Sequence, residues 1–335
     1  MLSGSHIESQ NHAGWLDGAL GVVFALEAAR TVAESDIPGG VDVMAFADEE
    51  GHFTEASFLG SQSFVGEVTE EMMDRSVCRS GRGTLRDMLD QAGLAGRPRL
   101  AIEPGRYKAF FEAHIEQGPT LETDNLKIGV VTSIVGIRQY RITFQGTQNH
   151  AGTTRMSIRR DAGKALMLLW HRIEEEFPQI VGPDSVWTIG RVTLEPGGPS
   201  IIPGAAEMIV QFRDPDEAIL ARLKGRLFEL AEEAGQGPCP ATIEVMSESK
   251  PAVMSDVPQA ALLEAAKAYA PDKFLTMPSG AGHDAQMIAP LVPSAMMFVP
   301  SIGGVSHHWS EDTTDEDIAL GVQVFVDAIG RMLQS

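Results

Sequence analysis

The stretch GSHIESQNHAGWLDGALGV, residues 4–22, places two histidines, two acids and several small residues directly before an apolar segment. Residues 18–33 are rich in alanine and leucine, which predicts a mostly buried helix. Asp17 stands just before this helix, where an N-cap residue is expected. Polar groups in such a place are typical of either a helix cap or a site, and the rest of the chain decides between the two.

The composition is typical of a soluble globular protein of two domains. The chain has 335 residues, of which 43% are apolar and 21% charged, and this length is more than one ordinary core requires. The formal net charge of −20 argues against a nucleic acid or an anionic membrane as partner, because no basic excess exists to replace counterions. A small anionic substrate stays compatible with this charge, since one arginine can bind its carboxylate.

The cysteines and the hydropathy pattern bear on the compartment. Cys78 and Cys239 form no CxxC pair, so we expect free thiols rather than a disulfide framework or a thiolate zinc site. No apolar run is long enough to span a bilayer, and the N-terminus lacks the pattern of a signal peptide. We therefore expect a cytoplasmic protein.

Strand and helix patterns alternate in the first part of the chain. Residues 39–51 and 108–119 are apolar runs that end in polar groups, and residues 83–93 between them predict a helix. This order indicates an α/β sheet with crossover helices. In such sheets ligands bind beyond the carboxyl ends of the strands.

From about residue 128 the pattern changes. Residues 128–146 alternate and are rich in β-branched side chains, which predicts antiparallel strands. Helices at 160–176 and 215–234, with three further strands, complete a four-stranded antiparallel sheet with two helices. After about residue 248 the α/β pattern returns. The predicted fold class is therefore α/β: a catalytic domain formed by residues 1–130 and 249–335, interrupted by an inserted α+β domain at 131–248.

Six polar side chains lie near predicted strand ends and are candidate metal ligands or bases. They are His6, Asp17, Glu49, Glu50, His114 and His307. Imidazoles and carboxylates are the usual ligands of Zn²⁺ and Mn²⁺, and one bridging carboxylate lets such a set hold two ions. Of the two adjacent glutamates, one can ligate an ion while its neighbour accepts a proton from water.

Each of these residues also has an ordinary structural interpretation when it is taken alone. Asp17 fits a helix cap, the two glutamates fit a solvated turn, and His114 fits a buried core histidine. His12, His52 and His171 have no evident partner and are interpreted as structural. The joint placement of the candidates at strand ends favours a site over these separate explanations.

Six motifs follow one another in the order found in the M20 metallopeptidase-like amidohydrolases, which the chain resembles over almost its whole length. The motifs are GSHIES with LDGALGV, FADEEG, EAHIEQGP, NHAGTTRMSIRRDA, MPSGAGHDAQ and GGVSHHWSE. The resemblance is to the subgroup of N-carbamoyl-L-amino-acid hydrolases, allantoate amidohydrolases and β-ureidopropionases. It implies a metallopeptidase-like catalytic domain with an inserted lid domain, through which such proteins form homodimers.

The resemblance also implies a role for each site residue. His6, Asp17 and His114 would bind one metal ion, and Asp17 would bridge to a second ion held by Glu50 and His307. The two ions would be Zn²⁺ or Mn²⁺, with Co²⁺ or Ni²⁺ as alternatives.

The remaining roles concern catalysis and the small-molecule substrate. Glu49 would be the general base, and His150 would stabilise the oxyanion, often from the partner subunit. Arg213 would bind the substrate carboxylate. The other predicted substrate-binding residues are Gln117, Ser200, Gly282 and His283.

The chain departs from the family pattern in several places. Glu8 stands where the family usually has aspartate, and Ser200 stands where it usually has asparagine. The chain also starts where the family is already well into its first domain. These departures bear on substrate identity more than on reaction type.

Three functions are therefore compatible with the sequence. The first is hydrolysis of an N-carbamoyl amino acid or a related ureido acid. The second is an aminoacylase- or dipeptidase-like activity with the same metals. The third is a non-catalytic small-molecule binding protein that keeps the fold.

Overall fold

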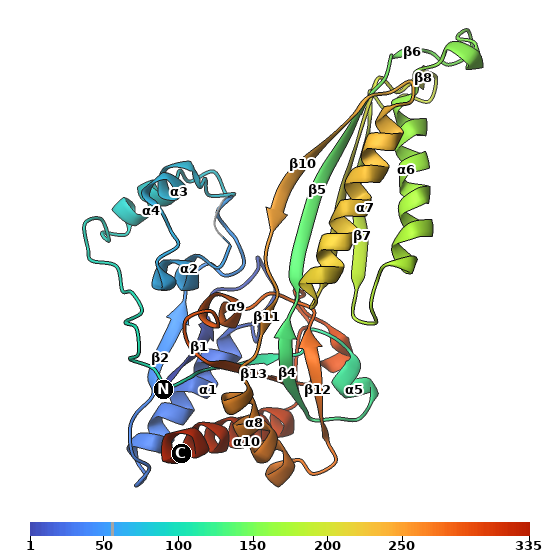
Figure 1. Cartoon of the computed structure of the whole chain (residues 1–335). Helices are drawn as coiled ribbons and strands as arrows, with labels where there is room; N and C mark the ends of the chain where they lie inside the picture. The colour runs from blue at the N-terminus through green and yellow to red at the C-terminus, as the bar shows by residue number, and fades with distance from the viewer. Residues whose placement is uncertain (55–56) are drawn as a thin grey trace. The chain divides into compact units, whose positions relative to one another are not determined.

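The computed structural model describes residues 1–54 and 57–335 and divides into two compact units. Unit 1 contains Met1–Ile134 and Ala252–Ser335, and unit 2 contains Val135–Pro251 (Figure 1). The second unit is thus inserted into the chain of the first. The sequence prediction places this insertion at residues 131–248.

Unit 1 is built on a mixed seven-stranded sheet within the described residues. The strand order is β11-β4-β13-β3-β1-β2, and β12 pairs with β4. Strands β2, β1, β3 and β13 are parallel to one another, so their carboxyl ends lie at one edge of the sheet. The strands are β1 (Leu2–His6), β2 (Asp42–Phe46), β3 (Phe110–Ile115), β4 (Ile128–Ile134), β11 (Ala252–Val253), β12 (Phe274–Ser279) and β13 (Ser294–Val299).

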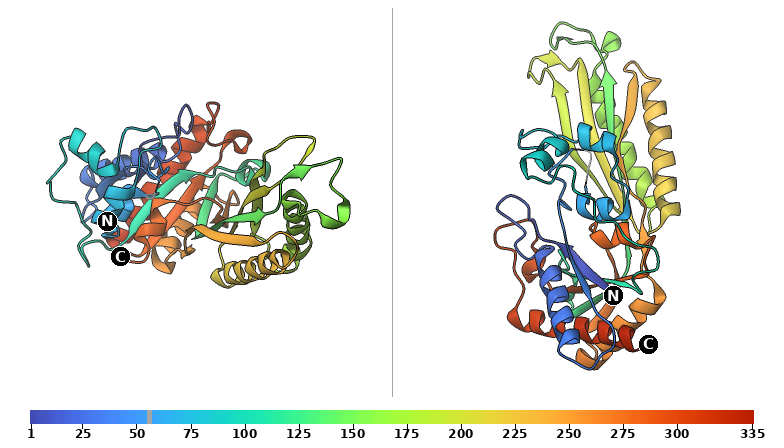
Figure 2. Two further views of the ribbon diagram at one scale, coloured as in Figure 1. Left: turned by 90° about the horizontal axis from the view of Figure 1, so that it is seen from above. Right: turned by 90° about the vertical axis from the view of Figure 1, so that its left-hand side faces the viewer.

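Helices pack on both faces of this sheet. One face carries α1 (Ala19–Ala33), α8 (Asp256–Tyr269) and α10 (Asp315–Gln334). The red α10 contacts both the blue α1 and the orange-brown α8 (Figures 1 and 2). The other face carries α2 (Leu59–Val65) and α9 (Asp284–Ile288). The remaining helical segments of this unit are α3 (Glu70–Arg75), α4 (Leu85–Gln91), α5 (Thr120–Thr123) and the 3₁₀ turn Ile302–Gly304.

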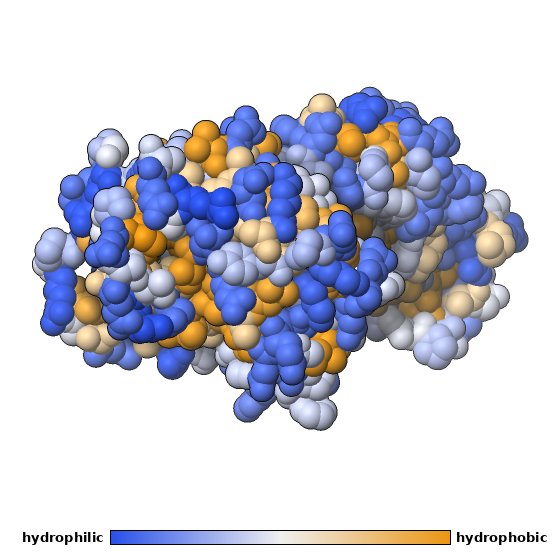
Figure 3. Space-filling view, turned by 90° about the horizontal axis from the view of Figure 1, so that it is seen from below, coloured by the Kyte–Doolittle hydropathy of each residue, from blue (hydrophilic) through white to orange (hydrophobic). Residues whose placement is uncertain are grey.

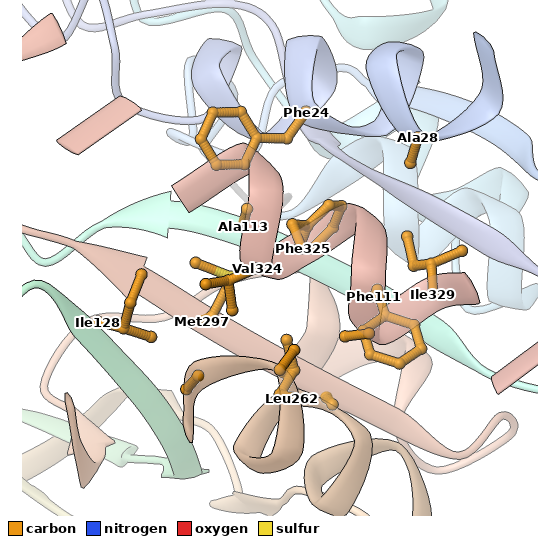
Figure 4. Packing of buried hydrophobic residues seen from close by; sticks show 14 of the residues in the cluster. Phe24, Ala28, Phe111, Ala113, Ile128, Leu262, Met297, Val324, Phe325 and Ile329 are labelled. Atoms are coloured by element: carbon orange, nitrogen blue, oxygen red, sulfur yellow. The ribbon is translucent and has the colours of Figure 1, made fainter. Parts of the chain in front are cut away.

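The alternation of side chains along the strands explains the two cores. Phe110 belongs to the cluster on the α2/α9 face, and its neighbour Phe111 belongs to the cluster on the α1/α10 face. In the second cluster the ring of Phe325 lies 5.9 Å from that of Phe24 and 6.2 Å from that of Phe111 (Figure 4). Each buried phenyl group stabilises the fold by about 1.5–3 kcal/mol.

Unit 2 is a four-stranded antiparallel sheet with two helices on one face. The strand order is β10-β5-β9-β7, and the buried residues of β5 and β9 alternate toward the helices. The elements are β5 (Gly136–Gln145), α6 (Ala162–Glu176), β7 (Val186–Glu195), β9 (Ala205–Asp214), α7 (Glu217–Gly235) and β10 (Ala241–Glu248). A short pair, β6 (Asn149–His150) and β8 (Ile201–Ile202), extends from it, and the 3₁₀ turns are Met156–Ile158 and Phe177–Gln179. The predicted fold class is confirmed.

Two details of the sequence prediction are wrong. The prediction groups strand β4 with the inserted domain, but β4 pairs with β12 and β13 and belongs to the large sheet. Asp17 does not cap α1, because the N-cap is Gly18 and no side chain donates or accepts there. Several elements lack a clear sequence pattern and are not predicted, among them α2, α3, α9 and β12.

The face shown in Figure 3 carries both polar and apolar side chains. On the face shown in Figure 3, polar side chains cover much of the area and apolar side chains lie in patches between them. Within residues 1–54 and 57–335, no helix is both long and apolar enough to cross a membrane.

Candidate metal centre and hydrolytic site

The parallel strands of unit 1 bring the candidate ligands to one edge of the sheet. His6 is the last residue of β1, and Glu49 and Glu50 follow β2, which pairs with β1 in register. His114 lies one residue before the end of β3, the other neighbour of β1. The carboxyl ends of these three strands therefore carry three of the polar clusters that the sequence singles out, as the rule for α/β sheets predicts.

Asp17 lies at the centre of the cluster. Its Oδ1 is 2.8 Å from His114 Nε2 and 3.5 Å from His6 Nε2, and its Oδ2 is 2.9 Å from His307 Nε2. His307 Nε2 is also 3.3 Å from Glu50 Oε1. Asp17 is only 2% exposed, so its carboxylate contacts these imidazoles rather than water.

The described residues form two groups of possible metal ligands, and within each group the ligand atoms lie within 4.8 Å of one another. One group is His6, Asp17 and His114, and the other is Asp17, Glu50 and His307. Both contain Asp17, and neither contains His12, His52 or His171.

The chemistry of this donor set fits divalent cations. Imidazole nitrogens and carboxylate oxygens together suit Zn²⁺ and related ions. The buried Glu50 Oε1 accepts no hydrogen bond within the described residues. It lies 3.3 Å from His307 Nε2. A buried carboxylate oxygen without a hydrogen bond is costly, and a cation bound between it and the imidazole would supply the missing partner.

Hydrogen bonds orient the two buried imidazoles. His6 Nδ1 lies 3.0 Å from the carbonyl oxygen of Glu8, and His114 Nδ1 lies 2.8 Å from that of Ile115. A carbonyl oxygen only accepts, so Nδ1 carries the proton in both rings and Nε2 faces Asp17. This is the arrangement by which metal-ligating histidines are usually held.

The imidazoles and carboxylates of this cluster shift one another's pKa values. Burial alone would lower the pKa of His6, but its hydrogen bond to Asp17 and the charge of Glu49 outweigh burial and raise that pKa to about 11. The carboxylates of Asp17 and Glu50, which lie 2.9 and 3.3 Å from its Nε2, raise the pKa of His307 to about 10. Burial would raise the pKa of Asp17, but His114 and the other imidazoles hold it well below its usual range. The cluster therefore attracts positive charge strongly.

Glu49 lies beside the ligands and is placed by Glu8. Its Oε2 is 3.8 Å from His6 Nε2, and its side chain is 11% exposed. The backbone N–H of Glu49 donates to Glu8 Oε1 at 2.5 Å. Burial raises the pKa of Glu49 well above its ordinary value, opposed by the charge of His6 and reinforced by Asp284 and Glu50. A carboxyl group with a raised pKa is a stronger proton acceptor than an ordinary glutamate.

Three predicted substrate-binding residues also lie in unit 1. Gln117 Nε2 donates to Asp17 Oδ2 at 2.9 Å, so its amide contacts the ligand shared by the two groups. His283 is 2% exposed, and its ring centroid lies 4.6 Å from that of His114. A Cβ atom at Gly282 would lie 2.6 Å from the ring of Phe58, so this position has no room for a side chain.

The other predicted residues, His150, Ser200 and Arg213, lie in unit 2. Nδ1 of the exposed His150 accepts from the backbone N–H groups of Gly152 and Thr153 at 3.0 and 3.2 Å. The proton of a neutral His150 therefore lies on Nε2, which makes that atom a hydrogen-bond donor. The carbonyl of Ser200 accepts from Ala151, and the pairing of β6 with β8 holds this loop.

Arg213 lies on β9, where it pairs with residues of β5 and β7. Its Nε donates to Gln211 Oε1 at 2.9 Å. Burial lowers the pKa of its guanidinium group, but the group stays charged at neutral pH.

Sequence reasoning missed two buried acids of unit 1. Glu112 is fully buried and accepts from Ser5 Oγ at 2.7 Å and from the N–H of Ala285 at 2.7 Å. Glu311 is 1% exposed and contacts the segments that carry Asp17 and His307. Both acids stand inside motifs that contain a predicted ligand, and that position was the signal that could have revealed them.

Comparisons with known proteins identify the family of the chain. The model of peptidase family M20/M25/M40 matches residues 5–331. The N-carbamoyl-L-amino acid amidohydrolase of Geobacillus stearothermophilus is 35% identical over 100% of this chain and 82% of its own. The allantoate amidohydrolase of Escherichia coli strain K12 is 34% identical over 96% and 79%. The crystal structure of an amidase of the hydantoinase/carbamoylase family from Burkholderia phymatum is 42% identical, with a TM-score of 0.89 over 99% of this chain and 81% of that one.

Proposed function

We propose, from the premise that the chain belongs to peptidase family M20/M25/M40, that it hydrolyses a ureido or amide C–N bond in a small substrate that carries a carboxylate. The chain is an amidohydrolase that acts on non-peptide C–N bonds, like its relatives. The substrate class proposed is an N-carbamoyl-L-amino acid or a related ureido acid, since both named relatives act on such ureido compounds.

One observation carries the proposal: the two ligand groups share the buried Asp17. A carboxylate shared by two ligand groups would let one side chain hold two divalent ions, which together would supply the charge stabilisation of a two-metal hydrolase. We propose that His6 and His114 complete one ion site and that Glu50 and His307 complete the other. Zn²⁺ and Mn²⁺ are the proposed ions, with Co²⁺ and Ni²⁺ as substitutes, because imidazole and carboxylate ligands accept each of them.

When bound, the ions polarise the substrate carbonyl and lower the pKa of an attacking water. Glu49 accepts the proton of that water at its carboxylate and then donates it to the leaving nitrogen. Two features of Glu49 support this role: it lies beside Glu50, a proposed ligand, and its pKa is raised by burial. The hydrogen bond from the backbone N–H of Glu49 to Glu8 Oε1 fixes the backbone that carries this carboxylate.

The remaining predicted residues bind and orient the substrate. His150, with its proton on Nε2, donates to the oxygen that develops negative charge. Arg213 binds the substrate carboxylate through its guanidinium group. Gln117, Ser200, Gly282 and His283 shape the substrate pocket in this proposal. We also propose a homodimer formed through unit 2.

The test is a substrate panel with protein freed of metal by chelation and reloaded with Zn²⁺ or Mn²⁺. N-carbamoyl-L-amino acids, their D-enantiomers, allantoate, N-acetyl-L-amino acids and dipeptides are compared by ammonia release and by release of free carboxylic acid. We expect ammonia from the L-carbamoyl acids or allantoate and only slow release of acetate.

Two other results would contradict the proposal. Faster release of acetate or of amino acids from dipeptides identifies an aminoacylase- or dipeptidase-like enzyme. Turnover of no substrate, together with fewer than one ion per chain, identifies a non-catalytic binding protein.

A further inference from the structure

We propose that Glu311 is a positioning residue of the metal centre, which ties the loop of Asp17 to the loop of His307. This inference rests on the proposed two-ion function. Glu311 lies between the 3₁₀ turn Ile302–Gly304 and α10, four residues after the proposed ligand His307, and has no role in the ligand assignments above.

The two carboxylate oxygens of Glu311 divide between the two loops. Oε1 accepts from the backbone N–H groups of Leu16 and Asp17 at 3.0 and 3.1 Å. Oε2 accepts from Ser306 Oγ at 2.9 Å and from the N–H of His307 at 3.2 Å. The residue is 1% exposed, so these four donors, and not water, satisfy its charge.

The loops joined in this way are far apart in the chain. Glu311 bonds to the backbone N–H of Asp17 across 294 residues and to that of His307 across four. These two N–H groups belong to ligands of the same group, Asp17–Glu50–His307. The positions of the two ligand backbones therefore depend on one carboxylate.

A second link between the loops has a different chemistry. Gln117 Nε2 donates to Asp17 Oδ2 at 2.9 Å and to Ser306 Oγ at 3.2 Å. This link uses a carboxylate oxygen that a bound ion would also use. The bonds of Glu311 use backbone N–H groups and the Ser306 hydroxyl, so they do not compete with an ion.

The two ligand groups should depend on Glu311 to different degrees. His6 and His114 lie on β1 and β3, which the sheet holds in register. His307 lies in a loop and is half exposed, with a backbone N–H whose acceptor is Glu311. Loss of Glu311 should therefore weaken the Glu50–His307 site more than the His6–His114 site.

Glu311→Gln is the sharpest variant, because it keeps the shape and replaces one oxygen by an NH₂ group. That NH₂ group must face either the backbone N–H groups of Leu16 and Asp17 or the Ser306 hydroxyl and the backbone N–H of His307. A backbone N–H only donates, so in either orientation the N–H of one ligand, Asp17 or His307, loses its acceptor. Either choice leaves one loop without its acceptor.

The experiment is a titration of the metal-free protein with Co²⁺. Calorimetry measures the affinity of each ion, and the visible absorption spectrum is recorded after each added equivalent. We expect two ions in the wild type. In Glu311→Gln we expect the first ion to bind as in the wild type and the second to bind about 10–100-fold more weakly with altered absorption bands. Steady-state kinetics of the reloaded protein should show a lower kcat and little change in KM.

Asp317→Asn is the matched control, because Asp317 is also buried but accepts from Thr314 at the start of α10. It should lower stability and leave both ion affinities unchanged. If Glu311→Gln fails to fold, Ser306→Ala decides, since it removes one of the four donors and should weaken the second ion to a smaller degree.

The outcomes separate the two proposals. A wild type that binds one ion refutes the two-ion centre and the role of Glu311 with it. If the wild type binds two ions and the Glu311 or Ser306 variant binds both with the affinities of the wild type, only the role of Glu311 is refuted. Equal weakening of both ions in the Glu311 variant and in the Asp317 control also refutes it, since that result indicates general destabilisation.

Discussion

The substitution Glu49→Gln tests the assignment of the base, because it should remove activity and at the same time stabilise the metal-free protein. Gln has the shape of Glu but cannot accept the proton of the attacking water. Glu50 and Asp17 belong to the ligand groups, so neither is available as a replacement base. A loss of activity without a loss of metal would separate the base from its ligand neighbour.

The expected size of both effects follows from the position of Glu49. A positioned general base contributes about 100–10,000-fold to the rate, which corresponds to about 3–5 kcal/mol of activation free energy. For stability, burial raises the pKa of Glu49 above the value of the unfolded chain. Above the pKa of the unfolded chain, the unfolded chain loses this proton more readily than the folded protein does, so folding is penalised at pH 7; the penalty is absent below about pH 4, where both states hold the proton.

The assay has three parts. Initial rates on the best substrate of the panel should fall about 1,000-fold or more. Metal content should match the wild type, and the melting temperature of the metal-free variant should exceed that of the wild type at pH 7 by about 2–4 °C for each kcal/mol recovered. This difference should vanish near pH 4. Rates within tenfold of the wild type, or a metal-free variant that is less stable at pH 7, would refute the assignment.

Three further predictions concern other parts of unit 1. In the metal-free protein, the pKa values of His6 and His307 are raised to about 11 and 10, so protonation of these residues should stabilise the fold. This stabilisation should be complete below about pH 6.5 and lost as the pH rises through 10–11. Midpoints of urea unfolding that stay constant from pH 6 to 11 would contradict this prediction. Gly18→Ala should abolish metal binding, because its φ is +74° and a Cβ atom would lie 2.3 Å from the His6 ring, whereas Gly40→Ala, with open space around it, should bind metal normally by elemental analysis. Phe325→Ala should cost about 3–5 kcal/mol in urea unfolding; a cost below about 1 kcal/mol would show that its contacts with α1 and β3 contribute little.

The sequence alone determined much of the site, for a physical reason that is local. A buried parallel strand is a short apolar run, and the polar residues that follow it mark its carboxyl end. The pair Glu49–Glu50 and His114 are therefore placed at one edge of a sheet by their sequence positions alone. His6 ends β1, whose sequence LSGSH is not an apolar run, so the pairing of β1 with β2 and β3 places it. The four-stranded insertion is predictable as well, because its strands alternate and its helices are amphipathic.

Other features cannot be read from local patterns. Asp17 has the sequence position of a helix cap, but in the structure its carboxylate faces three imidazoles and Gly18 occupies the cap position. Strand β4 has the same β-branched sequence pattern as the strands of the insertion, but it pairs with β12 and β13 in the large sheet. In each case the tertiary neighbours, and not the intrinsic preference, decided the role.

The part that only the tertiary structure decided is the convergence of distant loops. In the sequence, only the family resemblance relates Asp17 to His307, because no local periodicity connects residues so far apart. Their side chains meet because backbone hydrogen bonds fix the order and register of the strands, and because one buried carboxylate, Glu311, needs donors from both loops. Local patterns specify which residues stand at strand ends, whereas distances between those ends follow from long-range pairing and from the need to satisfy buried charge.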